Sequence, residues 1–240
     1  MPRIKVVFQS TLALLVAGLL VIGVARGAPA EKPAGVPGYP RTIYLVRHGA
    51  YDTAGDADEH AGHGLIPLGV AEARLVGARL RGLPGNFDSL TSSTLTRARQ
   101  TAQVIGEMFP QLTLRTDDLL SECEPHSVSA ELDARVSAPE LAAADAQLDR
   151  AFAKYFTPAA DHERRDMLVA HGNVIRFLVM KALGVDPRAW SKMSIAHCSL
   201  TIIRVLPDGN CKVLAVGDAG HIPPNLLSGV GLGDPQLVVP

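Results

Sequence analysis

The sequence predicts an α/β fold built on a mostly parallel sheet with one antiparallel edge. Short apolar runs alternate with amphipathic segments of helical length through most of residues 42–216, as expected when parallel strands are joined by helices. The last two apolar runs are separated only by the turn Pro207–Asn210, so we expect them to form a hairpin. A hairpin at the end of such a sheet gives it an antiparallel edge.

Each element follows from local composition and spacing. Thr42–Val46 is a short apolar run typical of a strand, whereas Ala71, Leu75 and Ala78 recur at nearly helical spacing. Gly184 is expected to end the last helix, because glycine readily adopts the left-handed conformation found there. In order, the predicted elements are strand 42–46, helix 69–81, strand 87–91, helix 96–109, strand 112–115, helix 140–155, strand 167–170, helix 174–183 and the hairpin strands 200–206 and 212–216.

The N-terminal segment, residues 1–30, differs from the rest of the chain. Basic residues precede Leu12–Ala25, a run without charged side chains, and the small residues Ala28–Ala30 follow. This order is typical of an export signal peptide, and the apolar stretch extended toward the N-terminus is nearly long enough for a membrane anchor. We therefore predict that the protein is exported across a membrane or anchored in one, which in a bacterium means periplasmic or membrane-associated.

The remaining chain divides into three parts. Residues 31–40 are rich in proline and glycine and are predicted to form a linker. Residues 41–228 are expected to form one folded domain, followed by a C-terminal tail at 229–240. The sequence leaves open whether the chain forms a homo-oligomer.

Composition excludes several classes of function. With 240 residues and 47% hydrophobic side chains, the chain can bury a large core and is not disordered. Its 23 basic and 24 acidic side chains nearly cancel, so no overall field attracts nucleic acid. Cys123, Cys198 and Cys211 follow no metal-binding spacing, and they allow at most one disulfide in an exported protein.

Polar residues stand at the ends of three predicted strands. Arg47 and His48 follow the first strand, Ser92 and Ser93 follow the second, and His171 follows the strand 167–170. In open α/β sheets, ligands bind beyond the carboxyl ends of the strands. These residues are therefore expected to converge on one site.

The side chains expected there suit a phosphoryl group. Arg47 and Arg97 offer permanent positive charges that pair with phosphate oxygens, together with His171. A neutral His48 can attack phosphorus and form a phosphohistidine, which needs neither a metal nor a cofactor. A protonated Glu122 can donate a proton to the leaving oxygen. Composition alone does not decide between Glu122 and the nearby Glu124, and Gly49 is expected to let substrate approach His48 closely.

Five segments, taken together and in order, resemble the histidine phosphatase superfamily in its phosphoglycerate-mutase-like branch. They are Leu45–Gly49, Leu65–Gly69, Ser92–Ala98 with Thr101, Glu122, and Ala170–Asn173. The resemblance implies a three-layer α/β/α sandwich, a phosphorylated His48, and Glu122 as the proton donor. It also implies that phosphate is bound by Arg47, Arg97, His171 and Gly172.

Three functions remain as candidates. Segments His171–Arg176 and Gly217–Pro224 most resemble the mitochondrial serine/threonine-protein phosphatases of that family, which implies a metal-independent phosphomonoesterase acting on phosphoprotein. An exported enzyme could instead act on phosphorylated envelope sugars or lipids. The candidate from another class is a membrane-tethered scaffold that binds phospho-ligands without turnover, although such a protein would be expected to lose His48 or the acid.

Overall fold

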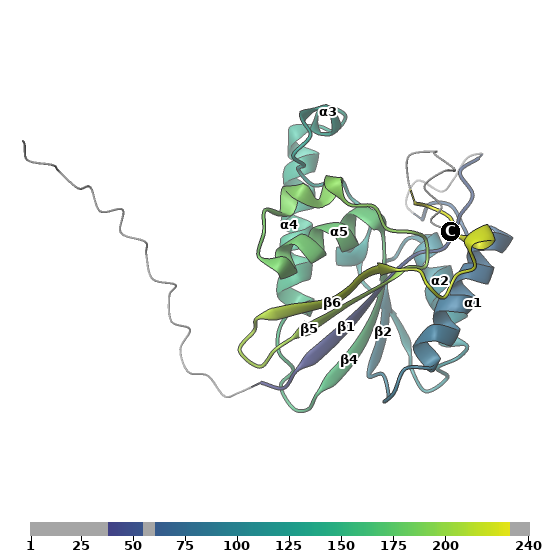
Figure 1. Cartoon of the computed structure of the whole chain (residues 1–240). Coiled ribbons are helices and arrows are strands. Elements are labelled where there is room, and N and C mark those ends of the chain that lie inside the picture. Colours follow the sequence, from purple (N-terminus) through teal and green to yellow (C-terminus); the bar gives the residue numbers. More distant parts are fainter. Residues whose placement is uncertain (1–37, 55–60, 231–240) are drawn as a thin grey trace, which may run out of the picture. The chain divides into compact units, whose positions relative to one another are not determined.

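A six-stranded sheet forms the centre of the computed structural model, which describes residues 38–54 and 61–230 (Figure 1). The strand order across the sheet is β3-β2-β4-β1-β5-β6. Strands β1 to β4 run parallel, while β5 lies antiparallel to both β1 and β6. The strands are β1 (Arg41–Arg47), β2 (Ser89–Ser92), β3 (Leu114–Thr116), β4 (Arg164–Ala170), β5 (Leu200–Val205) and β6 (Cys211–Asp218). The mostly parallel sheet with an antiparallel hairpin edge is confirmed.

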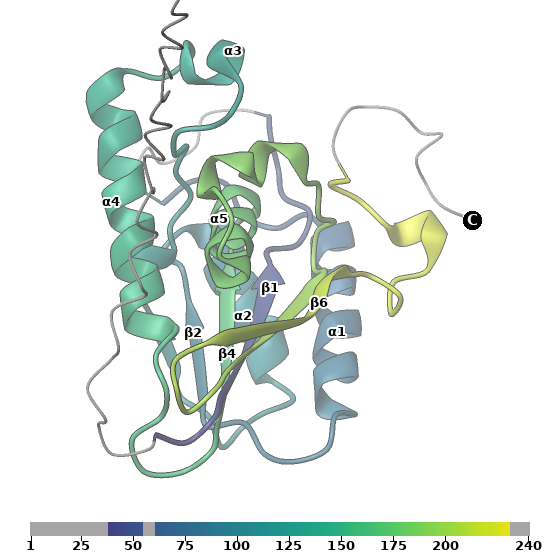
Figure 2. The same ribbon diagram turned by 60° about the vertical axis from the view of Figure 1, so that its left-hand side comes forward.

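Helices cover both faces of this sheet, as the two views together show (Figures 1 and 2). Helices α4 and α5 lie over one face, and α1 and α2 lie over the other. The helices are α1 (Pro67–Arg81), α2 (Thr96–Gly106), α3 (Ala130–Asp133), α4 (Ala138–Tyr155) and α5 (Gly172–Leu183), with short 3-10 turns η1 (Asp118–Leu120), η2 (Pro187–Lys192) and η3 (Pro224–Leu226). The three-layer α/β/α sandwich is therefore confirmed.

Alternation along the central strands divides the core in two. In β1, Ile43 and Leu45 pack toward α4 and α5, while Tyr44 and Val46 pack toward α1 and α2. Successive side chains of a strand point to opposite faces, so a strand covered on both sides is apolar throughout. The same division holds in β4, and it makes β1 and β4 the rigid centre of the sheet.

Local sequence explains most of the helix ends. Ser137 and Glu140 form a capping box at the start of α4, so that each side chain accepts from the backbone N–H of the other residue. Gly184 adopts φ +69° after α5, as expected for the residue that ends this helix. Helix α2 ends three residues earlier than predicted, because the chain tightens into 3-10 bonds after Gly106 and Pro110 follows.

The N-terminal prediction lies outside the described residues, since residues 1–37 are not among them. Within the described part of the chain, no helix is long and apolar enough to cross a membrane. The first described contact is a pair of backbone hydrogen bonds between Tyr39 and Ala159, just before β1 begins.

Candidate active site

The carboxyl ends of β1 and β4 bring the predicted residues together. Arg47 is the last residue of β1 and stands in register with the last residue of β4. His48 and His171 follow these two strands directly, and their ring centroids lie 5.0 Å apart. Arg97 enters from the first turn of α2, and Glu122 enters from the segment after η1. Parallel pairing of two strands therefore creates the site that the sequence predicted at this edge.

The hydrogen bonds of His48 fix its tautomer. Nε2 lies 3.2 Å from Nε of Arg97, and a guanidinium can only donate, so Nε2 carries a lone pair. The ring proton is then on Nδ1, which donates to the Gly49 carbonyl at 2.9 Å. Burial lowers the pKa of His48 well below its ordinary value, with further contributions from His171 and Arg47. His48 is therefore neutral at neutral pH, with a nucleophilic nitrogen beside a cation.

Arg47 is held in place by backbone carbonyls on the far side of the cavity. One terminal nitrogen donates to the carbonyl of Ile195 at 2.7 Å and to that of Gly229 at 2.6 Å. Its Nε is buried and makes no hydrogen bond with any described residue. Gly172 lies directly against this guanidinium, since a Cβ there would be 3.5 Å from Nε. The backbone thus orients Arg47 while leaving a donor unused.

Glu122 is a partly buried acid whose Oε1 atom is buried and has no partner among the described residues. Its Oε1 makes no hydrogen bond with the described residues, although Asn173 contributes a backbone hydrogen bond to the carboxyl group. Burial raises the pKa of Glu122 to about 7, and Arg97 and Arg47 oppose this rise. Glu124, by contrast, is exposed. Of the two carboxyl groups that composition could not separate, only Glu122 faces His48 and His171.

His171 completes the ring of polar groups. Its Nε2 lies 2.8 Å from Oγ of Ser93, a hydroxyl that also accepts the backbone N–H of Leu95. Its Nδ1 is buried and makes no hydrogen bond within the described residues. Burial, with Arg97 and Arg47 nearby, lowers the pKa of His171 well below its ordinary value. Ser93 therefore orients the ring, and Nδ1 is left to contact a ligand.

A cavity of about 160 Å³ adjoins Glu122 and Arg47. Gly172 and Asn173 line it at the start of α5, where backbone N–H groups and the helix dipole favour an anion. Arg176, one turn further along α5, also lines it and is held by the Met193 carbonyl and stacked on Trp190. The remaining lining residues are Ser194, Ile195 and Gly229. The cavity is therefore small and electropositive, Gly229 is its one lining residue from the C-terminal segment, and His48, Arg97 and His171 do not line it.

Sequence reasoning missed several residues of this site. The rings of His197 and Tyr51 each lie 5.1 Å from that of His48. Burial lowers the pKa of His197 to about 3, so its ring is neutral. Arg97 stacks over Tyr51 at 4.8 Å from the ring centre. Spacing could have identified Arg176, four residues after Gly172, but His197 precedes β5 and only the fold brings it here.

Glu72 links the loop after β1 to the C-terminal segment. This fully buried carboxyl group on α1 accepts the backbone N–H of Ala50 at 2.7 Å and the hydroxyl of Ser228 at 2.6 Å. Burial raises its pKa above the ordinary value, and the two hydrogen bonds oppose that rise. Ser228 in turn bonds to His197, so Glu72 fixes the backbone on two sides of the site.

Gly49 has a packing role that the sequence did not indicate. A Cβ at Gly49 would lie 2.5 Å from the carbonyl oxygen of Gly69, and a Cβ at Gly69 would collide with Ala50. The two glycines let the first turn of α1 pack directly on the loop after β1. This packing requirement stands beside the prediction that Gly49 lets substrate approach His48 closely, which stays a prediction.

One set of donor atoms has the spacing of a metal site. A ligand atom from each of His48, Glu122 and His171 lies within 4.8 Å of the others. However, Arg97 already donates to His48 Nε2, and Arg47 is also near, so two permanent positive charges oppose a cation here. The donor set fits an anion better than a metal ion.

A sequence model of the histidine phosphatase superfamily, branch 1, matches residues 43–218. This chain belongs to that superfamily. The family resemblance drawn from the five segments is thereby confirmed. The match runs from within β1 to the end of β6, so it includes His48, Arg97, Glu122 and His171.

Relatives of this histidine phosphatase share most of the described chain. The Caenorhabditis elegans serine/threonine-protein phosphatase Pgam5, mitochondrial, is 36% identical over 193 residues, which cover 78% of this chain and 66% of the relative. The Drosophila persimilis protein of the same name is 35% identical over 199 residues, covering 80% and 68%. This histidine phosphatase thus spans about two thirds of the length of these curated relatives.

A solved structure supports the fold of this histidine phosphatase. Phosphoglycerate mutase from Plasmodium falciparum superimposes with a TM-score of 0.54 at 24% identity, over 77% of this chain and 95% of that one. The phosphoglycerate-mutase-like architecture implied by the resemblance is therefore confirmed.

Proposed function

We propose that this chain is a metal-independent phosphomonoesterase that works through a phosphohistidine on His48. One observation carries the proposal: Arg47 Nε, Glu122 Oε1 and His171 Nδ1 are all buried without a hydrogen bond among the described residues. Leaving a buried polar group unpaired costs about 1–3 kcal/mol, so three around one nucleophile indicate groups kept for a ligand. Two donors and one acid suit a phosphoryl ester.

In the first step, the lone pair of His48 Nε2 forms a bond to phosphorus while the bond from phosphorus to the ester oxygen breaks. Protonated Glu122 gives its proton to the departing oxygen, and its pKa of about 7 leaves a substantial protonated fraction at neutral pH. Arg47, Arg97, His171 and the start of α5 at Gly172 stabilise the charge on the transferred group. The products of this step are an alcohol and phospho-His48.

In the second step, water attacks the phosphohistidine and the N–P bond breaks. Glu122, now a carboxylate, accepts a proton from this water, and the bonding electrons return to His48 Nε2. The hydroxyl of the water stays on phosphorus, so inorganic phosphate is the product. Glu122 is then protonated again for the next cycle. No metal or cofactor takes part in either step.

We further propose a serine/threonine phosphoprotein as the substrate. Two relatives with about 35% identity are named serine/threonine-protein phosphatases, which supports a phosphoprotein substrate. The cavity of about 160 Å³ beside Glu122 and Arg47 is too small for a large substrate, which must then lie mostly on the surface, as a polypeptide can. Phosphorylated envelope sugars or lipids remain the alternative if residues 1–30 direct export.

Membrane association is also a proposal, and it rests on the composition of residues 1–30 and not on the described structure. The relatives carry "mitochondrial" in their names, which supports a role near a membrane for proteins of this kind. Fractionation of cells that express the full chain, compared with a chain lacking residues 1–30, tests this point.

Trapping the covalent intermediate tests the mechanism. The full chain is mixed with a 32P-labelled phosphopeptide and quenched, and the label is expected on His48 in an acid-labile, base-stable form. A His48→Ala variant should take up no label, while the exposed His162→Ala variant should label normally. Label that is acid-stable, or that persists in His48→Ala, rejects the mechanism. Absence of turnover with every phosphoester would favour a phospho-ligand scaffold.

A further inference from the structure

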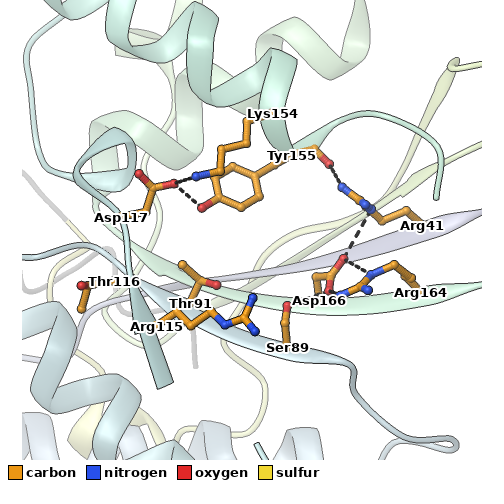
Figure 3. Close-up of a pocket in the computed structure, with 10 residues that line it drawn as sticks. All are labelled: Arg41, Ser89, Thr91, Arg115, Thr116, Asp117, Lys154, Tyr155, Arg164 and Asp166. Atoms are coloured by element: carbon orange, nitrogen blue, oxygen red, sulfur yellow. Dashed lines mark hydrogen bonds and ion pairs between the residues drawn. The ribbon is translucent and has the colours of Figure 1, made fainter. Parts of the chain in front are cut away.

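A second pocket, of about 250 Å³, lies beneath the C-terminal end of α4 and shares no lining residue with the active-site cavity (Figure 3). Its floor is the face of the sheet that α4 and α5 cover elsewhere. Four neighbouring strands contribute to it: Arg115 from β3, Ser89 and Thr91 from β2, Arg164 and Asp166 from β4, and Arg41 from β1. Asp117, Lys154 and Tyr155 close it from above.

Strand register explains why this part of the sheet is hollow and polar. Arg41 stands directly beside Arg164, Ser89 beside Asp166, and Arg115 beside Thr91. The same face further along β1 and β4 is apolar and filled by the core. Here the two side chains on β2 are small, so no bulky apolar group fills the space under α4.

The pocket has more positive than negative charge. Asp166 is shared by two arginines, with its oxygens 2.9 Å from Arg164 and 3.4 Å from Arg41, and it also accepts Ser89 Oγ at 2.6 Å. Two adjacent like charges on neighbouring strands repel, so a single carboxylate only partly offsets this pair.

The other side of the pocket repeats this imbalance. Lys154 donates to Asp117 at 2.6 Å, and Tyr155 donates to the same carboxylate oxygen. The side chain of Arg115, an exposed residue, extends into the pocket beside Ser89 and forms no hydrogen bond or ion pair with any described residue (Figure 3). Among the residues that line the pocket, four cations therefore face two carboxylates, and Asp88 and Asp161 lie outside the lining but also act on Arg164.

We propose that this pocket binds a free divalent oxyanion of the size of phosphate. The excess of cations over carboxylates among the lining residues suits an anion, and guanidinium groups present paired N–H donors that fit tetrahedral oxyanions. The volume is below the roughly 300–1,000 Å³ typical of pockets for drug-sized ligands, so a small ion fits better than a large molecule. The inference does not depend on the proposed hydrolysis.

Asp117 connects this pocket to the catalytic side of the sheet. Its other oxygen accepts the backbone N–H of Leu119 and so caps η1, and Glu122 lies just beyond that turn. The hydroxyl of Ser121, between them, contacts Ser93, which orients His171. An anion that draws Lys154 away from Asp117 would act on the segment that carries the proposed proton donor.

Titration of the 15N-labelled full chain with inorganic phosphate, at fixed pH and ionic strength, tests the site. Backbone amide signals of Arg115, Asp117 and Tyr155 are expected to shift saturably and so report binding at this pocket. Signals of Gly49 and Gly172 report separately on phosphate bound in the active site. Arg115→Gln should weaken binding at the pocket by about tenfold or more, because a charge-assisted hydrogen bond is lost. The same variant should leave the active-site signals and their phosphate affinity unchanged.

Arg74→Gln is the matched control, because Arg74 is an exposed arginine on α1, a helix on the opposite face of the sheet. It should bind phosphate at the pocket as the wild type does. The proposal is wrong if phosphate gives no saturable shift at the pocket, or if Arg115→Gln binds as tightly as wild type. It is also wrong if acetate at equal ionic strength gives the same affinity, since a monovalent carboxylate would then suffice.

Discussion

The two polar pockets of this protein handle charge in opposite ways. In the active site, burial dominates: it raises the pKa of Glu122 to about 7 and lowers that of His48 well below its usual range. In the pocket under α4, ion pairs and hydrogen bonds decide the direction of the pKa shift. Burial there pushes the pKa of Asp117 upward, but hydrogen bonds from Lys154 and Tyr155 hold it below the ordinary value.

The difference is the one expected between a pocket that carries the proposed chemistry and a pocket whose charges are mostly paired. In the active site, Arg47 Nε, Glu122 Oε1 and His171 Nδ1 make no hydrogen bond with described residues, while His48 Nε2 accepts one from Arg97. Groups under α4 are joined mainly in ion pairs that stabilise the folded chain. Perturbed acids and bases that lack partners are characteristic of catalytic sites. Substitutions in the two pockets should therefore have separable effects.

Removal of the nucleophile should have the largest effect. His48→Ala is expected to lower kcat by roughly 10⁴-fold or more, because the group that forms the proposed covalent intermediate is removed. Steady-state kinetics with an aryl phosphate in the presence of a chelator measures this effect. Wild-type activity that disappears with chelator alone would indicate a metal-dependent reaction instead.

Substitution of the proton donor should come next. Glu122→Gln is expected to lower kcat by roughly 10² to 10⁴, because the leaving oxygen loses its general acid. Glu124→Gln, two residues away and exposed, is the matched control and should retain full activity. If the two variants exchange these results, the acid is Glu124. The effect should also shrink for an aryl phosphate, whose better leaving group needs less protonation.

The pH profile should show which protonation state is active. Attack requires neutral His48, whose pKa is depressed, and protonated Glu122, whose pKa is about 7. We expect kcat/KM to be highest below pH 7 and to fall about tenfold for each pH unit above it, as Glu122 loses its proton. Glu122→Gln should abolish this alkaline decline, after correction for the ionisation of the substrate. A decline that persists in the variant would contradict the assignment.

Substitutions under α4 should lower the free energy of unfolding more than substitutions in the active site, which is the reverse of their order of effect on activity. Asp166→Asn is expected to lower the free energy of unfolding by about 1–3 kcal/mol, because two arginines lose their shared carboxylate. Glu122→Gln should change it by less than about 1 kcal/mol, since an amide oxygen can still accept the Asn173 N–H. Urea unfolding of both variants measures the difference. Equal losses would mean that Glu122 is also a structural residue.

Much of this protein can be read from its sequence because the strongest signals are local. Apolar runs predicted each strand, and apolar residues at helical spacing predicted each long helix. However, β2 begins two residues later than predicted and β4 begins three residues earlier. The early start of β4 was not predicted because Arg164–Asp166 is charged. The place of these three residues in the sheet depends on ion pairs under α4. Periodicity detects apolar burial but not charges that are buried in pairs.

Sequence by itself determined the order of elements and the strand ends at which Arg47, His48 and His171 stand. Tertiary structure decided what no spacing could: that β4 pairs beside β1, that Glu122 and not Glu124 turns inward, and that His197 joins the site from the segment before β5. The reason is physical. Local propensity depends on neighbours along the chain, whereas burial, pKa and hydrogen bonding depend on residues that only the packed sheet brings together.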